Sequence, residues 1–179
     1  MAKTPQQPYQ DLAKLESLEF RYYPQAIMAT VKTNDTSYKS SSSKNFSVLA
    51  RYIFGGNAKK ESIAMTAPVH MSFGNEASSM SFVMPVGYDL NNLPAPLSSN
   101  INLHQSNEAY VVALRFGGYA SDEKIKEKKT ILLELLQKNG IAHDNKFRYL
   151  GYNAPWDFLF RRNEILVGIS SETAGQFKN

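Results

Sequence analysis

The chain of 179 residues contains no cysteine, which excludes disulfides, thiolate metal ligands, cysteine nucleophiles and thioether attachment of a cofactor. It also lacks any apolar run close to the roughly 20 residues that a membrane-spanning helix needs. Residues 1–10 are polar and rich in proline and glutamine, unlike a signal peptide. We therefore expect a cytoplasmic protein from the sequence as it stands, or a periplasmic or organellar one if a targeting segment is removed from a precursor.

The recurring motifs of enzymes are missing as well. The sequence has no Gly-x-Ser-x-Gly, no P-loop, no dinucleotide-binding Gly-x-Gly-x-x-Gly and no His-Glu-x-x-His. The three histidines, His70, His104 and His143, are too far apart for a short metal-ligand spacing. No nucleophile–base pair or metal set can be named, so we predict a protein that is not an enzyme.

Charge of one sign is not concentrated anywhere, although the net charge is +4. Four lysines crowd residues 124–129, but three acidic residues lie among them in 122–127, which is typical of a solvated helix face. We expect no nucleic-acid partner. The 42% of hydrophobic residues and 12% of aromatic residues instead indicate one globular, β-rich domain.

The hydrophobic periodicity changes from strand-like to helical and back, and it does so twice. The first series comprises strand-like runs at 19–24 and 26–31, a helix ending at Gly55-Gly56, and strands near 62–71 and 80–86. A connector follows at 89–107. The second series comprises a strand at 109–116, a helix capped by Ser121, and strands near 146–153 and 164–169. An Ala-Pro pair follows the helix in both series, within 65–69 and within 152–156.

This order predicts an α+β fold, a pseudo-symmetric distorted antiparallel β-barrel built from two βαββ repeats with two flanking helices. We place a single domain at residues 18–170, with repeat halves at about 18–90 and 108–170. Residues 1–17 read as a tail or a docking segment, because Leu12, Leu15 and Leu18 recur at a spacing that suits a short helix. Residues 171–179 read as a C-terminal tail.

Large apolar residues stand beside two arginines in the segment 156–164, which has the composition of a loop. Such side chains require burial or a ligand. Arg161 and Arg162 have two open alternatives: ion pairs with Asp157 and Glu164, or pairing with the carboxylates of a ligand.

Seven segments together resemble the SOUL heme-binding family, in the order of that family and across residues 19–169. They are Glu19-Phe-Arg-Tyr-Tyr-Pro24, Leu49-Ala-Arg-Tyr-Ile-Phe-Gly-Gly-Asn57, Ile63-Ala-Met-Thr-Ala-Pro-Val69, Met80-Ser-Phe-Val-Met-Pro85, Arg115-Phe-Gly-Gly-Tyr-Ala120, Tyr152-Asn-Ala-Pro-Trp156 and Arg161-Arg-Asn-Glu164.

The resemblance implies non-covalent binding of heme or a related tetrapyrrole, by a carrier or buffer, in a shallow apolar cleft beside the first helix. Carried onto this chain, the binding residues are Ser47, Val48, Arg51 and Tyr52 from the helix, with Phe158, Phe160 and Arg161 from the loop. Arg51 and Arg161 would pair with the propionates.

The sequence departs from family members that ligate iron through a histidine on or near the first helix, because residues 40–54 contain none. The axial ligand is then His70, Tyr52, a methionine or no protein group. Iron ligation is not required, since packing at about 0.3 kcal/mol per ligand atom reaches a micromolar dissociation constant for a porphyrin.

Two other functions compete with tetrapyrrole binding. The doubled βαββ scaffold is also similar to bacterial effector-binding domains, which suggests a module for another hydrophobic small molecule. The segment from Tyr9 to Leu18 suggests a protein-interaction scaffold, for which the sequence identifies no partner.

Overall fold

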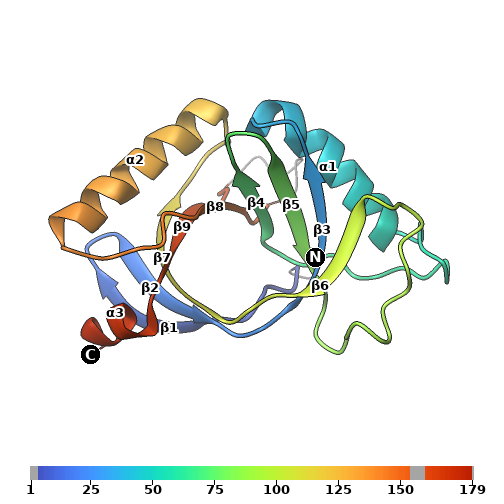
Figure 1. Cartoon of the computed structure of the whole chain (residues 1–179), viewed down its shortest axis with the longest axis horizontal. Helices are drawn as coiled ribbons and strands as arrows, with labels where there is room; N and C mark the ends of the chain where they lie inside the picture. The colour runs from blue at the N-terminus through green and yellow to red at the C-terminus, as the bar shows by residue number, and fades with distance from the viewer. Residues whose placement is uncertain (1–3, 154–159, 179) are drawn as a thin grey trace. The chain divides into compact units, whose positions relative to one another are not determined.

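The computed structural model describes residues 4–153 and 160–178, and their contacts divide the chain into two compact units. Among the described residues, unit 1 comprises 4–7 and 25–107. Unit 2 comprises 8–24 and the residues from 108 onward. Each unit is an antiparallel sheet with one long helix packed on it (Figure 1).

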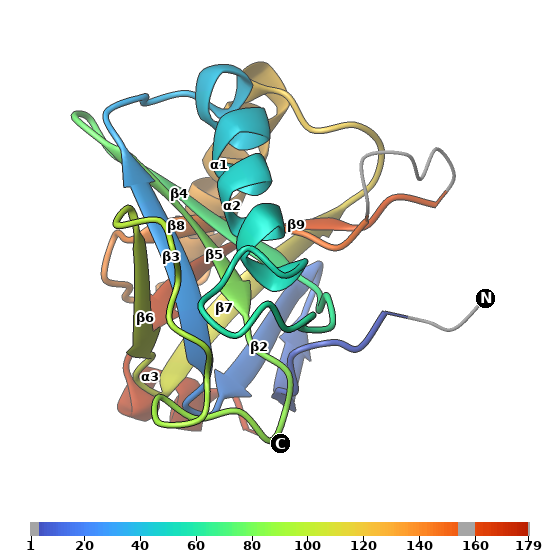
Figure 2. The ribbon, with the colours of Figure 1, turned by 90° about the vertical axis from the view of Figure 1, so that its right-hand side faces the viewer.

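Unit 1 is an antiparallel sheet in the order β4-β5-β3-β6. Its elements are β3 (Ile27–Thr33), α1 (Tyr38–Ile53), β4 (Val69–Phe73), β5 (Ser78–Val83) and β6 (Ile101–Gln105). Helix α1 packs on β3 and β5, as Figure 2 shows from the side. Phe82 of β5 contacts Phe46 of α1, so Phe82 lies on the sheet face that α1 covers. Because side chains alternate along a strand, Ser81 and its cross-strand partner His70 lie on the face away from α1.

Unit 2 is an antiparallel sheet in the order β1-β2-β7-β9-β8. Its elements are β1 (Gln10–Leu15), β2 (Leu18–Tyr23), β7 (Ala109–Phe116), α2 (Asp122–Lys138), β8 (Phe147–Gly151), β9 (Asn163–Ile169) and α3 (Ser171–Gln176). Helix α2 packs on β7 and β9, and α3 packs on β7. Phe20 of β2 stacks on Phe177, which follows α3, with ring centroids 4.6 Å apart.

The two units repeat one topology. In unit 1 the series β3-α1-β4-β5 and in unit 2 the series β7-α2-β8-β9 are both βαββ motifs. In both, the third strand of the motif lies between the second and the first. The predicted α+β class with two βαββ repeats is confirmed. Among the described residues, no helix combines the length and apolarity that a membrane span requires.

The helix ends follow local sequence signals, as predicted. Ser121 caps α2 by accepting a hydrogen bond from the backbone N–H of Lys124 at 3.2 Å. Helix α1 is followed by Gly55 at φ 99°, a conformation that favours glycine. A Cβ on Gly56 would stand 2.5 Å from the carbonyl oxygen of Arg51, so this position also requires glycine. Both residues after α1 therefore need to be glycine, Gly55 for its positive φ and Gly56 for its close approach to the Arg51 carbonyl.

The structure corrects several predicted element boundaries. The N-terminal segment forms β1 and not a helix. Leu12 lies at a β-bulge between Asp11 and Ala13, and Leu15 pairs with Leu18 across the turn from β1 to β2, so the three-residue spacing is not helical. Strand β2, expected in the first repeat, pairs with β7 and belongs to unit 2. The predicted connector contains β6, and the predicted C-terminal tail contains α3. Strand β4 begins only at Val69, directly after Pro68, whose nitrogen has no hydrogen to donate.

Candidate functional site

The outward side of α1 carries an exposed set of residues at its C-terminal end. Ser47, Arg51 and Phe54 follow one another at spacings of four and three, which places them on one side of the helix. All three are exposed, and Val48 beside them is half-buried. Phe54 is 66% exposed, which is unusual for a phenylalanine. This surface, which we call the α1 face, combines an arginine with an aromatic ring.

Phe54 was missed by the sequence prediction. Tyr52, Ile53 and Phe54 are consecutive, and at about 100° per residue they span about 200° of the helix, so all three cannot face the sheet. Tyr52 and Ile53 are buried and Phe54 is not. Three consecutive large apolar residues at the end of an amphipathic helix are the signal that identifies such a position.

Tyr52, also predicted as a binding residue, lies inside unit 1. It is 1% exposed, and its hydroxyl donates a hydrogen bond to the carbonyl of Pro94 at 2.9 Å. Burial raises the pKa of Tyr52 to about 12, so the hydroxyl stays protonated. In this position it joins α1 to the segment before β6 and is not part of the exposed α1 face.

The predicted loop residues belong to unit 2. Phe158 lies outside the described residues. Phe160 is 97% exposed with φ 54°, and Arg161 is half-buried with its Cζ 4.9 Å from the centre of the Tyr119 ring. The helix set and the loop set of the predicted site thus lie in different compact units.

His70, the predicted axial ligand, is buried on the sheet face that points away from α1. Its Nε2 is 2.7 Å from Oε1 of Gln7. The same face carries Thr30, whose hydroxyl lies 2.6 Å from Oγ of Ser81 and 2.8 Å from Nε2 of His104. A ligand on the α1 face is separated from His70 by both the helix and the sheet.

Unit 2 buries a charged cluster on the sheet face opposite α2, because Phe147 of β8 contacts Lys129 of α2 and Glu164 alternates to the other face. Arg21 and Glu164 are both 0% exposed, and Nη1 and Nη2 of Arg21 lie 2.7 and 2.9 Å from the two carboxylate oxygens of Glu164. Arg21 also pairs with Glu19. Burial alone would raise the pKa of Glu164, but hydrogen bonds and charge from Arg21 and Arg162 hold this pKa below its ordinary value.

Arg162 completes this cluster. Its Nε and Nη2 donate to Oε1 of Glu164 at 2.9 and 2.7 Å, and its guanidinium lies 3.9 Å from the centre of the Tyr152 ring. Of the two alternatives for the loop arginines, Arg162 therefore forms an ion pair with Glu164. Asp157, the other predicted carboxylate, lies outside the described residues. The cluster is a satisfied structural network that needs no ligand for its charge.

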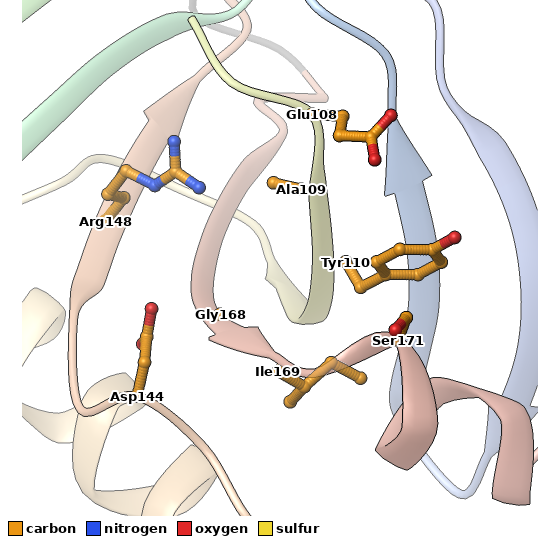
Figure 3. A pocket seen from close by; sticks show the side chains of 8 residues that line it. All are labelled: Glu108, Ala109, Tyr110, Asp144, Arg148, Gly168, Ile169 and Ser171. Atoms are coloured by element: carbon orange, nitrogen blue, oxygen red, sulfur yellow. The ribbon is translucent and has the colours of Figure 1, made fainter.

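A cavity of about 370 Å³ opens in unit 2 at the ends of β7, β8 and β9 (Figure 3). Its lining residues are Glu108, Ala109, Tyr110, Asp144, Arg148, Gly168, Ile169 and Ser171. In Figure 3 the guanidinium of Arg148 extends from β8 toward the space between these strands. No sequence motif marks this cavity, since its residues come from three separate segments. Among the described residues, no group of three or more metal-ligating side chains is arranged to hold a metal ion.

The duplicated βαββ units define an α+β domain, and comparison with known proteins assigns its family. The model of the SOUL heme-binding protein family matches residues 4–168, so the chain belongs to this family. The resemblance identified from the seven sequence segments is confirmed.

Several relatives share much of this chain. Human heme-binding protein 2 is 30% identical over 83% of this chain and 76% of its own length. Pig heme-binding protein 1 is 24% identical over 88% of this chain and 89% of its own. Among solved structures, the C-terminal domain of EcmrR aligns with a TM-score of 0.65 at 14% identity, covering 90% of this chain and 98% of that domain. This last likeness shows a shared fold.

Proposed function

We propose that this protein binds heme or a related tetrapyrrole reversibly and without covalent attachment, as a carrier or buffer. The observation that carries the proposal is membership of the SOUL heme-binding family across residues 4–168, with relatives named heme-binding proteins 1 and 2. The absence of cysteine supports a non-covalent mode. We propose binding without catalysis, because neither the motifs nor the described side chains suggest a reaction.

The α1 face is the proposed contact surface in unit 1. Phe54 and Val48 offer apolar area to a macrocycle, and Arg51 offers a planar guanidinium to a propionate. Arg51 forms no ion pair with another described residue, so its charge is available. Phe160 and Arg161 supply the corresponding pair of residue types in unit 2.

Iron coordination by His70 is not part of this proposal. A porphyrin on the α1 face lies on the far side of the helix and sheet from that imidazole, whose Nε2 is already within hydrogen-bonding distance of Gln7. Packing and charge pairing then account for the affinity. The expected consequence is similar binding of hemin and of metal-free protoporphyrin IX.

The test is a Soret-region titration of the purified protein with hemin, run beside protoporphyrin IX. We expect a saturable band at one equivalent for both ligands, with a dissociation constant near about 1 μM. Phe54→Ser should weaken binding about tenfold through lost apolar contact, and Arg51→Gln two- to fivefold, as an exposed ion pair allows. Arg115→Gln, which removes an exposed arginine of unit 2, is the matched control and should bind normally.

Phe160→Ser and Arg161→Gln measure the contribution of the unit 2 residues separately. If neither porphyrin binds at about 100 μM, the proposed function is wrong. A strong preference for hemin that disappears in His70→Ala would refute the packing mode and return iron coordination to His70.

A further inference from the structure

The unit 2 cavity contains an arginine that forms no ion pair in the described part of the chain, although the charge of Asp144 acts on it at longer range. Arg148 is half-buried, and its guanidinium forms no hydrogen bond or ion pair with any other described residue. Burial lowers the pKa of Arg148, partly opposed by the charge of Asp144, yet a guanidinium remains protonated at neutral pH. An unpaired charge removed from water costs stability unless something binds it. Arg148 differs in this respect from Arg21, which lies on the same sheet face and pairs with Glu19 and Glu164.

The two acidic residues of the cavity, Glu108 and Asp144, accept hydrogen bonds from different partners. Oε2 of Glu108 accepts a hydrogen bond from the Tyr22 hydroxyl at 2.7 Å, and in Figure 3 its carboxylate points away from Arg148. Oδ1 of Asp144 accepts from the backbone N–H of Lys146 at 2.8 Å. Asp144 and Arg148 are not within ion-pair distance of each other, so each can pair with a different group of one ligand.

Gly168 makes room for the acidic side of the cavity. A Cβ at this position would overlap with Oδ2 of Asp144, so any other residue would displace that carboxylate. The backbone N–H of Asp144 donates to the Gly168 carbonyl at 2.9 Å, which keeps the two residues together. The remaining lining residues are Ala109, Tyr110, Ile169 and Ser171. Ala109 lies on the sheet face of Arg148, whereas Tyr110 and Ile169 are partners on the opposite face.

We propose that this cavity is a second ligand site, which binds a small zwitterion of the amino-acid type. The ligand carboxylate pairs with the guanidinium of Arg148, its cationic nitrogen pairs with Asp144, and its side chain lies against Ala109, which is on the same sheet face as Arg148. The volume of about 370 Å³ lies at the small end of the range for ligand pockets. Two carboxylates in the lining disfavour a dianion such as phosphate. The site lies wholly in unit 2, so it does not depend on the α1 face.

Three matched probes test the charge pattern: phenylalanine, 3-phenylpropionate, which lacks the ammonium, and phenethylamine, which lacks the carboxylate. Binding is followed by calorimetry and by amide chemical shifts of Gly168 and Ile169. We expect phenylalanine to bind with a dissociation constant below about 1 mM, 3-phenylpropionate about tenfold more weakly, and phenethylamine not measurably.

Three variants assign the roles. Arg148→Gln should weaken phenylalanine binding about ten- to hundredfold, since it removes a charged hydrogen-bonding group. Asp144→Asn keeps the side-chain shape and should reduce phenylalanine to the affinity of 3-phenylpropionate. Arg115→Gln is the control for loss of a positive charge and should change nothing. Circular dichroism confirms that each variant is folded.

Several outcomes would overturn the proposal. They are no shift at Gly168 or Ile169 with any probe, equal binding of phenylalanine and phenethylamine, or undiminished binding in Arg148→Gln. Loss of hemin binding in Arg148→Gln without any phenylalanine binding would mean that the cavity holds a propionate of the tetrapyrrole instead. Failure of hemin to bind while phenylalanine binds would refute the proposed function and leave this inference standing.

Discussion

Replacing Arg21 with methionine tests whether the buried charges of unit 2 act as a structural network. The substitution keeps an unbranched apolar stem but removes the guanidinium, which donates to both oxygens of Glu164 at 2.7 and 2.9 Å. Removing one partner of a buried ion pair costs about 3–5 kcal/mol. Glu164 retains Arg162 at 2.7 Å and the Tyr152 hydroxyl at 3.0 Å, so the loss should lie near the lower limit. We expect the free energy of unfolding to fall by about 3 kcal/mol.

The same substitution at Arg148 is the matched control. Arg148 lies on the same sheet face of the same unit, but its guanidinium forms no hydrogen bond or ion pair with another described residue. Arg148→Met should therefore leave the free energy of unfolding within about 1 kcal/mol of the parent, or raise it, because an unpaired charge is removed.

Urea denaturation followed by circular dichroism measures both variants. With a slope of about 2 kcal/mol/M, a loss of about 3 kcal/mol lowers the midpoint by about 1.5 M. Equal losses in the two variants would mean that pairing does not distinguish them. A loss below about 1 kcal/mol for Arg21→Met would show that the network contributes little to stability, contrary to the reasoning from its geometry.

Three further predictions concern single interactions. The pKa of Glu164 in the folded protein lies below its ordinary value of 4.5, so the ionised carboxylate contributes its full stability above pH 4.5, and this contribution is lost as the pH falls through the lowered pKa. The urea midpoint should therefore decline on acidification, and the decline should be smaller in Glu164→Gln. Tyr52→Phe removes the hydrogen bond to Pro94 and should cost about 1 kcal/mol in urea unfolding, whereas no change would mean that the bond is not formed in solution. Gly56→Ala forces a Cβ against the Arg51 carbonyl and should lower the free energy of unfolding by about 1–3 kcal/mol, and an unchanged Tm would contradict the close approach of these two groups.

The local sequence determined the elements of the two βαββ motifs and their repetition. Ser121 and the Gly55-Gly56 pair marked helix ends through capping geometry and backbone conformation, which depend on a few neighbouring residues. The apolar periodicity of α1, which includes the buried Ile53, also depends only on residues three or four positions apart. Because these signals are short-range, the sequence predicted the order strand–helix–strand–strand in both halves of the chain. The family segments occur in the same order.

Strand boundaries and partners were less accessible to the sequence. Alternation at two-residue spacing says that a strand exists but does not say which strand lies beside it. Strand β2 was assigned to the nearer repeat, whereas it pairs with β7, about ninety positions later in the chain. In β1, a bulge at Leu12 and the tight turn between Leu15 and Leu18 together gave the leucines a spacing that resembles a helix.

The tertiary structure alone decided how the charged residues are used. The composition of the loop left Arg161 and Arg162 with the same two alternatives, yet Arg162 binds Glu164, and Arg21 reaches that same carboxylate across a separation of 143 residues. The cavity likewise gathers Tyr110, Asp144 and Gly168 from segments that share no motif. Periodicity and capping act over a few residues, whereas the pairing of a buried charge depends on which distant strands the sheet places side by side.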